Sequence, residues 1–357
     1  MAERVVWHVG LPKTGTTYLQ SVLWANTEAL ASQGIFLPGT SARQHMHASV
    51  VVRDHPGLSK RAPEVRDSWG DLVADVHRHP GTAIISPEFF GAASTDQVRR
   101  ACAALAPAKV EVVITARDLL SVVSSYWQEF IKHGFDSPLD EFPAPERDYD
   151  EWSWAALDLA TVVRRWLTGL PTGADHPEHV HVVVLPPPGS PREALLAEFA
   201  GVAGFDPSGM ATDQAQENSG LGVVEAELLR RLTPHLTSFT SARDRGVWIR
   251  SYLAQNKLVP RGGERFLPSP QRVAQLRERA AAGVEFVRGA GCHVVGDLDR
   301  LLVPETLPDL RHPGSVTDAE VLAAAAELFA VVLGDVRIFR EHNTALRRAG
   351  LRAPEAP

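Results

Sequence analysis

The sequence predicts an α/β protein with a central parallel sheet. In the first 206 of its 357 residues, short apolar runs alternate with longer segments of helical periodicity, as in a parallel sheet with helices on both faces. The apolar runs carry valine and isoleucine at consecutive positions, which is typical of strands covered on both sides. After about residue 207 most segments have a helical pattern. We therefore expect an α/β core followed by a mainly helical cover.

The predicted elements follow in chain order. The strands are expected at 5–9, 34–37, 82–85, 111–115 and 180–185. The helices between them are expected at 16–32, 96–105, 119–133 and 152–167. Consecutive prolines from Pro186 to Pro188 end the last strand, because proline has no N–H to donate to a sheet.

The second half of the chain reads mainly as helix. Helices are expected at 223–232, 270–288 and 317–348, with one extended segment at 292–295. Thr317 and Glu320 have the spacing of a capping box at the start of the last helix. We predict a single domain over 1–357, with an α/β core at 1–206, a helical cover at 207–350 and a loose tail at 351–357.

Composition and charge narrow the range of partners and compartments. The formal net charge of -7 disfavours a general surface for nucleic acid or anionic membranes. The two cysteines are too few for a disulfide framework or a cysteine zinc site, and they fit a reducing compartment. We find neither a secretory signal nor an apolar stretch long enough to span a bilayer. We expect a cytoplasmic protein with no nucleic-acid or membrane partner.

The residues Gly10-Leu11-Pro12-Lys13-Thr14-Gly15-Thr16-Thr17 lie between the first strand and the first helix. A helix start presents free N–H groups and the positive end of its dipole, so it attracts anions. The glycines let the backbone approach phosphate oxygens, Lys13 adds a charge, and the threonine hydroxyls are further donors. The alternative is an ordinary turn with a solvated lysine, which the coincidence of these features disfavours. The segment predicts a phosphate-binding loop.

This loop differs from a Walker A motif. That motif has lysine directly after its second glycine, whereas here Lys13 precedes Gly15 and Thr16 stands in the usual lysine position. The residue that would hold a β- or γ-phosphate is therefore replaced.

A second anion site is predicted at the end of the strand 111–115. Arg117 follows the strand at its carboxyl end, where open α/β sheets bind ligands. Asp118 is expected to cap the next helix, and Ser125 lies eight residues after Arg117, close to two helical turns. Arg117 and Ser125 could therefore hold one anion. Taken alone the pair is a weak signal, because arginines at strand ends often pair with nearby acids.

Together these motifs resemble the sulfotransferases that use 3'-phosphoadenosine 5'-phosphosulfate. Pro12-Lys13-Thr14-Gly15-Thr16-Thr17 is similar to the 5'-phosphosulfate loop of that family, and the resemblance implies that Lys13 stabilises the leaving group. It also implies that Arg117 and Ser125 hold the 3'-phosphate, although Asp118-Leu119 replaces the family's frequent Asn-Pro. The implied fold is P-loop-like with three layers. The implied product is adenosine 3',5'-bisphosphate.

Two other functions stay open. A P-loop kinase or nucleotide hydrolase is disfavoured by the displaced Lys13 and by the lack of an evident magnesium acid other than Asp118. A non-catalytic nucleotide-binding module is the second alternative. No histidine pair has helical metal spacing, and sulfuryl transfer needs no metal, so we predict no metal cofactor.

Acceptor activation calls for a general base within reach of the nucleophile. Glu88 follows the strand 82–85 and is one candidate, although an acid is also favoured in a helical first turn. His47, which we expect in a polar loop with His45, is the other. His8 lies within a strand and is expected to be a hydrogen-bonded core residue.

The acceptor is expected to be a small molecule or a saccharide. Trp127, Gln128 and Lys132 continue the helix from Ser125 and could line its pocket. Tryptophan is more often a core residue, so these are the weakest of the predicted site residues.

Overall fold

The computed structural model describes residues 1–144, 151–173, 175–212 and 220–348. The chain forms two compact units, each built from three segments. Unit 1 comprises Met1–Tyr126, Glu141–Glu217 and Pro270–Leu307. Unit 2 comprises Trp127–Asp140, Asn218–Ser269 and Pro308–Pro357. The predicted tail at 351–357 lies outside the described residues.

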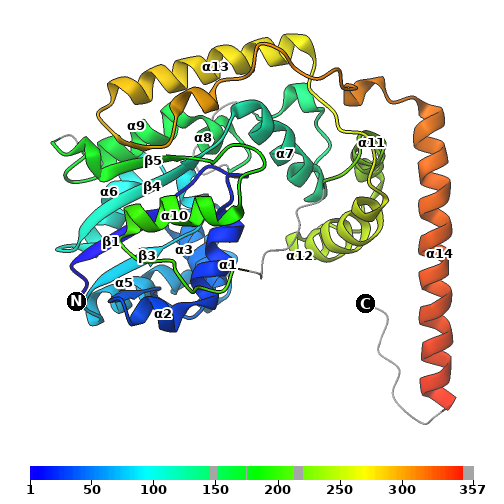
Figure 1. The fold of residues 1–357 in the computed structure, drawn as a ribbon. Helices are drawn as coiled ribbons and strands as arrows, with labels where there is room; N and C mark the ends of the chain where they lie inside the picture. Colours follow the sequence, from blue (N-terminus) through cyan, green and yellow to red (C-terminus); the bar gives the residue numbers. More distant parts are fainter. Residues whose placement is uncertain (145–150, 174, 213–219, 349–357) are drawn as a thin grey trace. The chain divides into compact units, whose positions relative to one another are not determined.

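A six-stranded parallel sheet forms the centre of unit 1 (Figure 1). Its strand order is β2-β3-β1-β4-β5-β6, and every neighbouring pair is parallel. The strands are β1 (Arg4–His8), β2 (Ile35–Phe36), β3 (Thr82–Ile85), β4 (Lys109–Ala116), β5 (Val180–Val184) and β6 (His293–Val295). This confirms the predicted parallel α/β sheet. Because β3 and β4 flank β1, the segments that leave these three strands emerge side by side at the carboxyl edge.

Helices cover both faces of the sheet, so unit 1 has three layers. One face packs against α1 (Thr16–Ala25), α2 (Thr27–Ala31) and α10 (Arg192–Ala203). The other face packs against α3 (Ala42–Val52), α5 (Ser68–Arg78), α6 (Thr95–Leu105), α9 (Leu159–Gly169) and α13 (Pro270–Gly289). Consecutive β1 residues alternate between the two hydrophobic clusters, as the pleat of a strand requires.

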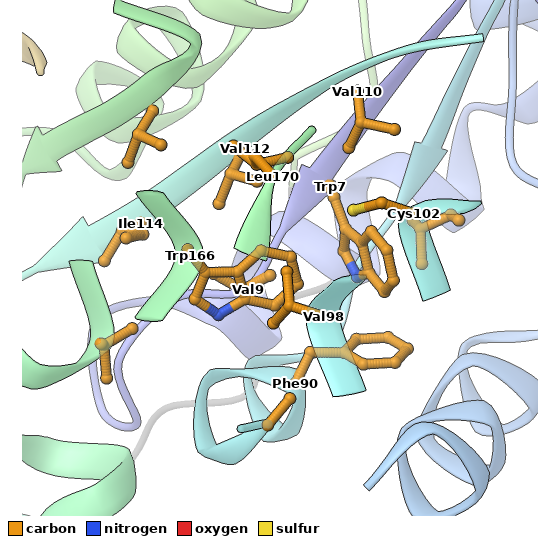
Figure 2. Close-up of a cluster of buried hydrophobic side chains, with 14 of the residues drawn as sticks. Trp7, Val9, Phe90, Val98, Cys102, Val110, Val112, Ile114, Trp166 and Leu170 are labelled. Atoms are coloured by element: carbon orange, nitrogen blue, oxygen red, sulfur yellow. The ribbon is translucent and has the colours of Figure 1, made fainter. Parts of the chain in front are cut away.

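Trp7 lies at the centre of one hydrophobic layer (Figure 2). Its ring is fully buried, with ring centroids 4.8 Å from Phe90 and 5.1 Å from Trp166 in edge-on contacts. Aromatic contacts of this kind add to the free energy of burial. This packing holds β1 firmly, and with it the start of the loop that follows.

Short helices complete unit 1. They are η1 (Leu58–Lys60), α4 (Pro63–Arg66), η2 (Glu88–Ala92), α8 (Trp154–Leu157), η4 (Pro177–His179) and η8 (Leu298–Leu301). The short helix η3 (Leu139–Glu141) spans the boundary between the units, which falls after Asp140. The helix α7 (Leu119–Lys132) contains the boundary between the units, after Tyr126.

Unit 2 is helical in its described part. It contains α11 (Val223–Leu232), η5 (Thr233–His235), α12 (Ala242–Asp244), the π-helix η6 (Arg245–Leu258), η7 (Val259–Arg261), η9 (Pro313–Ser315) and α14 (Asp318–Arg348). The predicted capping box is confirmed, because Glu320 Oε2 accepts the Thr317 N–H at 2.8 Å and Thr317 Oγ1 accepts the Glu320 N–H at 3.3 Å.

Several predicted boundaries were wrong. The predicted helix 16–32 is two helices that meet at Asn26, and 152–167 is interrupted at Asp158, whose carboxylate caps α9. The sequence reading also missed α3, α5 and α10. The extended segment 292–295 is confirmed as β6, which pairs with β5, so the sheet draws on residues beyond 206. In the described part of the chain, no helix has the length and apolar character needed to cross a bilayer.

Candidate functional site

Three predicted site segments follow three neighbouring strands. The Gly10–Thr17 loop follows β1, Glu88 follows β3, and Arg117 follows β4. Parallel strands end at one edge of a sheet, so the topology brings the three segments together. Gln20 of α1 makes a direct connection, because its Nε2 donates to Glu88 Oε2 at 3.2 Å. The loop, Glu88, Arg117 and Ser125 are called the candidate site below.

The loop has the backbone of an anion cradle. Lys13 has a φ of 63° and Gly15 a φ of 81°, so both adopt the left-handed conformation. Gly15 is the N-cap of α1 and provides no side-chain cap. The first N–H groups of a helix have no acceptor within it. The N-terminus of α1 is therefore suited to bind an oxyanion.

Hydrogen bonds to Thr115 of β4 hold the loop in place. The Leu11 N–H donates to the Thr115 carbonyl at 2.9 Å. Thr14 is fully buried, and its hydroxyl donates to the Leu11 carbonyl and lies 2.7 Å from Thr115 Oγ1. The expectation that the Thr14 hydroxyl donates to a ligand was therefore wrong, because its hydrogen is used inside the loop. Its backbone N–H is a separate donor.

Close packing explains both glycines. A Cβ at Gly10 would lie 2.7 Å from Thr115 Oγ1, and a Cβ at Gly15 would lie 2.5 Å from Leu195 Cδ2. Gly15 also needs its positive φ, which other residues rarely adopt. From the sequence, the glycines were expected to let the backbone approach a phosphate. The structure shows that they also let the loop pack closely against Thr115 and Leu195.

The remaining loop residues differ in exposure. Pro12 and Thr16 are buried, while Thr17 is exposed in the first turn of α1. Thr17 is thus the loop threonine whose hydroxyl is open to a ligand, and Thr16 presents its backbone N–H.

Arg117 is half-exposed at the end of β4. Its Nε lies 3.5 Å from Asp118 Oδ2, while Asp118 Oδ1 accepts the Ser121 N–H at 2.8 Å and caps α7, as predicted. Arg117 and Leu11 also line a cavity of about 20 Å³ together with Asp158 and Arg279, which form an ion pair at 2.7 Å. Ser125 is half-buried on α7, and the neighbouring Ser124 Oγ is buried without a hydrogen-bond partner among the described residues.

Glu88 is half-buried at the first position of η2. It thus occupies a helical first turn, and its contact with Gln20 also directs it toward the loop helix. Gln20 is one turn after Thr16 on α1. The position of Glu88 therefore fits both an acid favoured in a helical first turn and a general base near the loop. Its catalytic role stays a prediction.

The expectation of a polar loop around His45 and His47 was wrong, because both lie on α3. His45 is fully buried, and burial lowers its pKa to about 4. His47 is half-buried, and burial followed by the charges of Arg43 and Arg61 lowers its pKa. A neutral imidazole can accept a proton. The helix α3 packs against η2, but among the described residues no hydrogen bond or ion pair joins His47 to the loop or to Glu88.

The predicted acceptor residues lie in unit 2, whereas the loop lies in unit 1. Trp127 is fully buried and donates from Nε1 to the Ser137 carbonyl at 2.9 Å. Gln128 Oε1 accepts the Leu221 N–H at 2.8 Å. Lys132 is buried with its Nζ 3.1 Å from Glu129 Oε1. These contacts give all three side chains a structural use within unit 2, and an acceptor role for them stays a prediction.

Gln20, Ser86 and Thr115 were missed by the sequence reading. Their signal was present but weak, since Ser86 and Thr115 are polar residues at the ends of apolar strands and Gln20 lies one turn into the loop helix.

A group of three potential metal ligands, His176, Glu178 and His179, lies at the amino end of β5 and thus at the opposite edge of the sheet.

Comparisons with known proteins do not assign the chain, because no family model, no curated protein and no solved structure matches it. The function must therefore be argued from the chemistry of the candidate site.

Proposed function

We propose that the protein is a sulfotransferase that moves a sulfuryl group from 3'-phosphoadenosine 5'-phosphosulfate to a hydroxyl or amine of a small-molecule or saccharide acceptor. The observation that carries the proposal is the placement of Lys13, Glu88 and Arg117 after the neighbouring strands β1, β3 and β4. An ammonium, a carboxylate and a guanidinium at one sheet edge suit a doubly phosphorylated nucleotide beside a proton acceptor. The P-loop-like character of the fold is part of this proposal.

The loop residues would hold the 5' end of the nucleotide. The uncapped N-terminus of α1 offers backbone N–H groups, and Thr17 offers an exposed hydroxyl. Lys13 adds a full positive charge next to them, where charge develops on the leaving group during transfer. The nucleotide supplies the activated sulfuryl group and a phosphate leaving group.

Arg117 and Ser125 would hold the 3'-phosphate. Arg117 is half-exposed and its contact with Asp118 is long at 3.5 Å, so a phosphate with its higher charge can compete for the guanidinium. Asp118 also serves as the cap of α7, because its Oδ1 accepts the Ser121 N–H, so its carboxylate is shared between the helix and Arg117. A 3'-phosphate site at these residues would separate the proposed donor from ATP, which has no 3'-phosphate.

Glu88 would accept the proton of the acceptor nucleophile. Its contact with Gln20 fixes the carboxylate beside the loop helix while the side chain stays half-buried. The proton moves from the acceptor hydroxyl or amine to a Glu88 oxygen as the bond to sulfur forms. His47, neutral because its pKa is lowered, is the alternative acceptor of this proton.

Calorimetric titration with adenosine 3',5'-bisphosphate tests the proposal. We expect binding without magnesium, and much weaker binding of magnesium ATP. Arg117→Ala should weaken binding of the bisphosphate while the affinity for AMP, which lacks the 3'-phosphate, stays unchanged. Preference for magnesium ATP would favour a kinase or hydrolase. Bisphosphate binding without transfer to any acceptor would favour a non-catalytic module.

A further inference from the structure

A chain of hydrogen bonds runs beneath the loop. His8, the last residue of β1, is fully buried, with Nδ1 2.8 Å from Ser86 Oγ and Nε2 3.1 Å from Thr115 Oγ1. Thr115 Oγ1 lies 2.7 Å from Thr14 Oγ1, which in turn donates to the Leu11 carbonyl. The chain therefore links the end of β3, the end of β1, β4 and the loop.

Counting hydrogens gives this chain one direction. The Leu11 carbonyl can only accept, so Thr14 donates its single hydroxyl hydrogen there. The contact between Thr14 and Thr115 then needs the Thr115 hydroxyl as donor. Thr115 Oγ1 must in turn accept from an N–H at His8 Nε2.

The other nitrogen of His8 follows from the charge of the ring. Burial lowers the pKa of His8 to about 3, so the ring is neutral near pH 7 and carries one N–H. With that hydrogen on Nε2, Nδ1 has a free lone pair and accepts from the Ser86 hydroxyl. All four hydrogen bonds thus point from Ser86 toward Leu11.

His45 fixes Ser86 from the other side. Its Nε2 lies 2.6 Å from the Pro38 carbonyl, which requires an N–H at Nε2, and its Nδ1 accepts the Ser86 N–H at 3.2 Å. Ser86 therefore donates its backbone N–H to His45 and its hydroxyl hydrogen to His8. Both rings are held in the same tautomer.

We propose that His8 is a positioning residue of the candidate site, which in its Nε2–H tautomer holds the loop and the ends of β3 and β4 in register. Lys13 directly precedes Thr14, Glu88 lies two residues after Ser86, and Arg117 lies two residues after Thr115. Each charged group of the site is therefore one or two residues away from a member of the hydrogen-bond chain. Gly10 closes over it, since a Cβ there would lie 3.1 Å from His8 Nε2.

Nitrogen NMR of the histidine rings tests the tautomer directly. In protein labelled with nitrogen-15, we expect the His8 signals of a protonated Nε2 and a bare Nδ1 at pH 7, and the same pattern for His45. The exposed His77, on α5, provides the reference signals of a ring that is open to solvent. An Nδ1–H tautomer or a doubly protonated His8 would overturn the proposal, whatever the protein binds.

A pair of substitutions at Thr115 tests the positioning role. Thr115→Val keeps the shape but removes the hydroxyl that joins His8 to Thr14. Amide hydrogen exchange at Leu11 and Leu19, whose N–H groups donate to the Thr115 and Gly15 carbonyls, should therefore accelerate about fivefold or more, the factor for one lost buried hydrogen bond. Thr115→Ser restores the hydroxyl and should restore slow exchange. Unchanged exchange in Thr115→Val, or no rescue by serine, would contradict the proposal.

Nucleotide affinity gives a separate readout that rests on the proposed function. If wild-type protein binds adenosine 3',5'-bisphosphate, Thr115→Val should bind it about fivefold or more weakly and Thr115→Ser nearly normally. Equal binding by all three would count against His8 as a positioning residue. If the wild type binds no nucleotide, the proposed function fails, and the ring-nitrogen and exchange measurements still decide the inference.

Discussion

At the scale of single residues, the candidate site depends on where charge is placed. Lys13 combines an ammonium with a left-handed backbone, a conformation that a lysine adopts only when its surroundings impose it. The buried Thr14 and the hydrogen bonds to Thr115 supply that constraint. The sequence revealed the lysine and the two glycines. It could not reveal that the Thr14 hydroxyl is used inside the loop, because the direction of a side chain depends on the neighbouring strand.

Lys13→Ala should abolish most transfer activity while the fold stays intact. The substitution removes the charge that we propose stabilises the leaving group, an effect of about 10²–10³-fold for a single electrostatic donor. Initial rates with a range of acceptors measure it, with circular dichroism to check folding. Lys60→Ala, at an exposed lysine in η1, is the control. Equal rates for wild type and Lys13→Ala would remove Lys13 from the mechanism.

Glu88→Gln should slow transfer about 10²–10⁴-fold without weakening nucleotide binding. Glutamine keeps an oxygen for the contact with Gln20, but it cannot accept the acceptor proton at neutral pH. Single-turnover rates and calorimetric affinity separate the two effects. An unchanged rate would leave His47 as the leading base, and His47→Gln would then be the next variant to measure.

At the scale of elements, the two edges of the sheet carry different groups of charged residues. The carboxyl edge carries the candidate site, whereas the amino edge carries an ion cluster around the buried Glu111 of β4. Arg4 Nε donates to Glu111 Oε2 at 3.0 Å, Lys109 Nζ lies 2.8 Å from Oε1, and His181 Nε2 lies 3.4 Å from Oε2. Burial alone would raise the pKa of Glu111, but the contacts of its carboxylate with His181, Arg4 and Lys109 outweigh burial and lower the pKa.

Glu111→Gln should destabilise the protein by about 3 kcal/mol, because it leaves Arg4 half-buried without its counter-ion. Urea unfolding measures the loss. Glu285→Gln is the matched control, since that side chain is 79% exposed against 10% for Glu111 and lies 3.7 Å from Arg288. Its free energy of unfolding should change by less than about 0.5 kcal/mol. Similar values for the two variants would show that the Glu111 cluster is not stabilising.

The elements that the sequence predicted best were those with one strong local signal. The strand 82–85 and the helix 223–232 matched the structure at both ends, because each is an apolar or amphipathic run bounded by glycine and proline. The helix α3 was missed because its polar start, Gln44 to His47, resembles a loop. Its inner face is set by tertiary packing of Ala48 and Val52, and His45 is buried by its bonds to Pro38 and Ser86. Such long-range contacts leave no local pattern.

At the scale of the whole molecule, buried neutral histidines make stability depend on pH. Burial lowers the pKa of His8 to about 3 and of His45 to about 4, against 6.5 for an exposed histidine. Below pH 6.5 the unfolded chain protonates both rings, while the folded protein takes up neither proton until about pH 4. Stability is therefore fully present above pH 6.5 and falls as the pH drops toward 4.

The expected contribution is about 1.4 kcal/mol per pH unit for each of the two histidines. Urea unfolding between pH 7 and pH 4.5 gives the slope. His45→Gln should reduce that slope by about one proton per molecule, even if the variant is less stable at pH 7. A slope that does not change in this variant would mean that His45 is already protonated in the folded protein.

The strand β6 lies after most of the helical segments in the chain, and yet it pairs with β5 in the sheet. The two units alternate through six segments, so neither unit corresponds to one continuous stretch of coding sequence. A gene fragment ending at residue 206 would lack both β6 and α13, which would leave β5 as a bare edge and uncover the apolar surface of α9. We expect such a fragment to aggregate on expression, and engineering of the site is best done in the full-length chain.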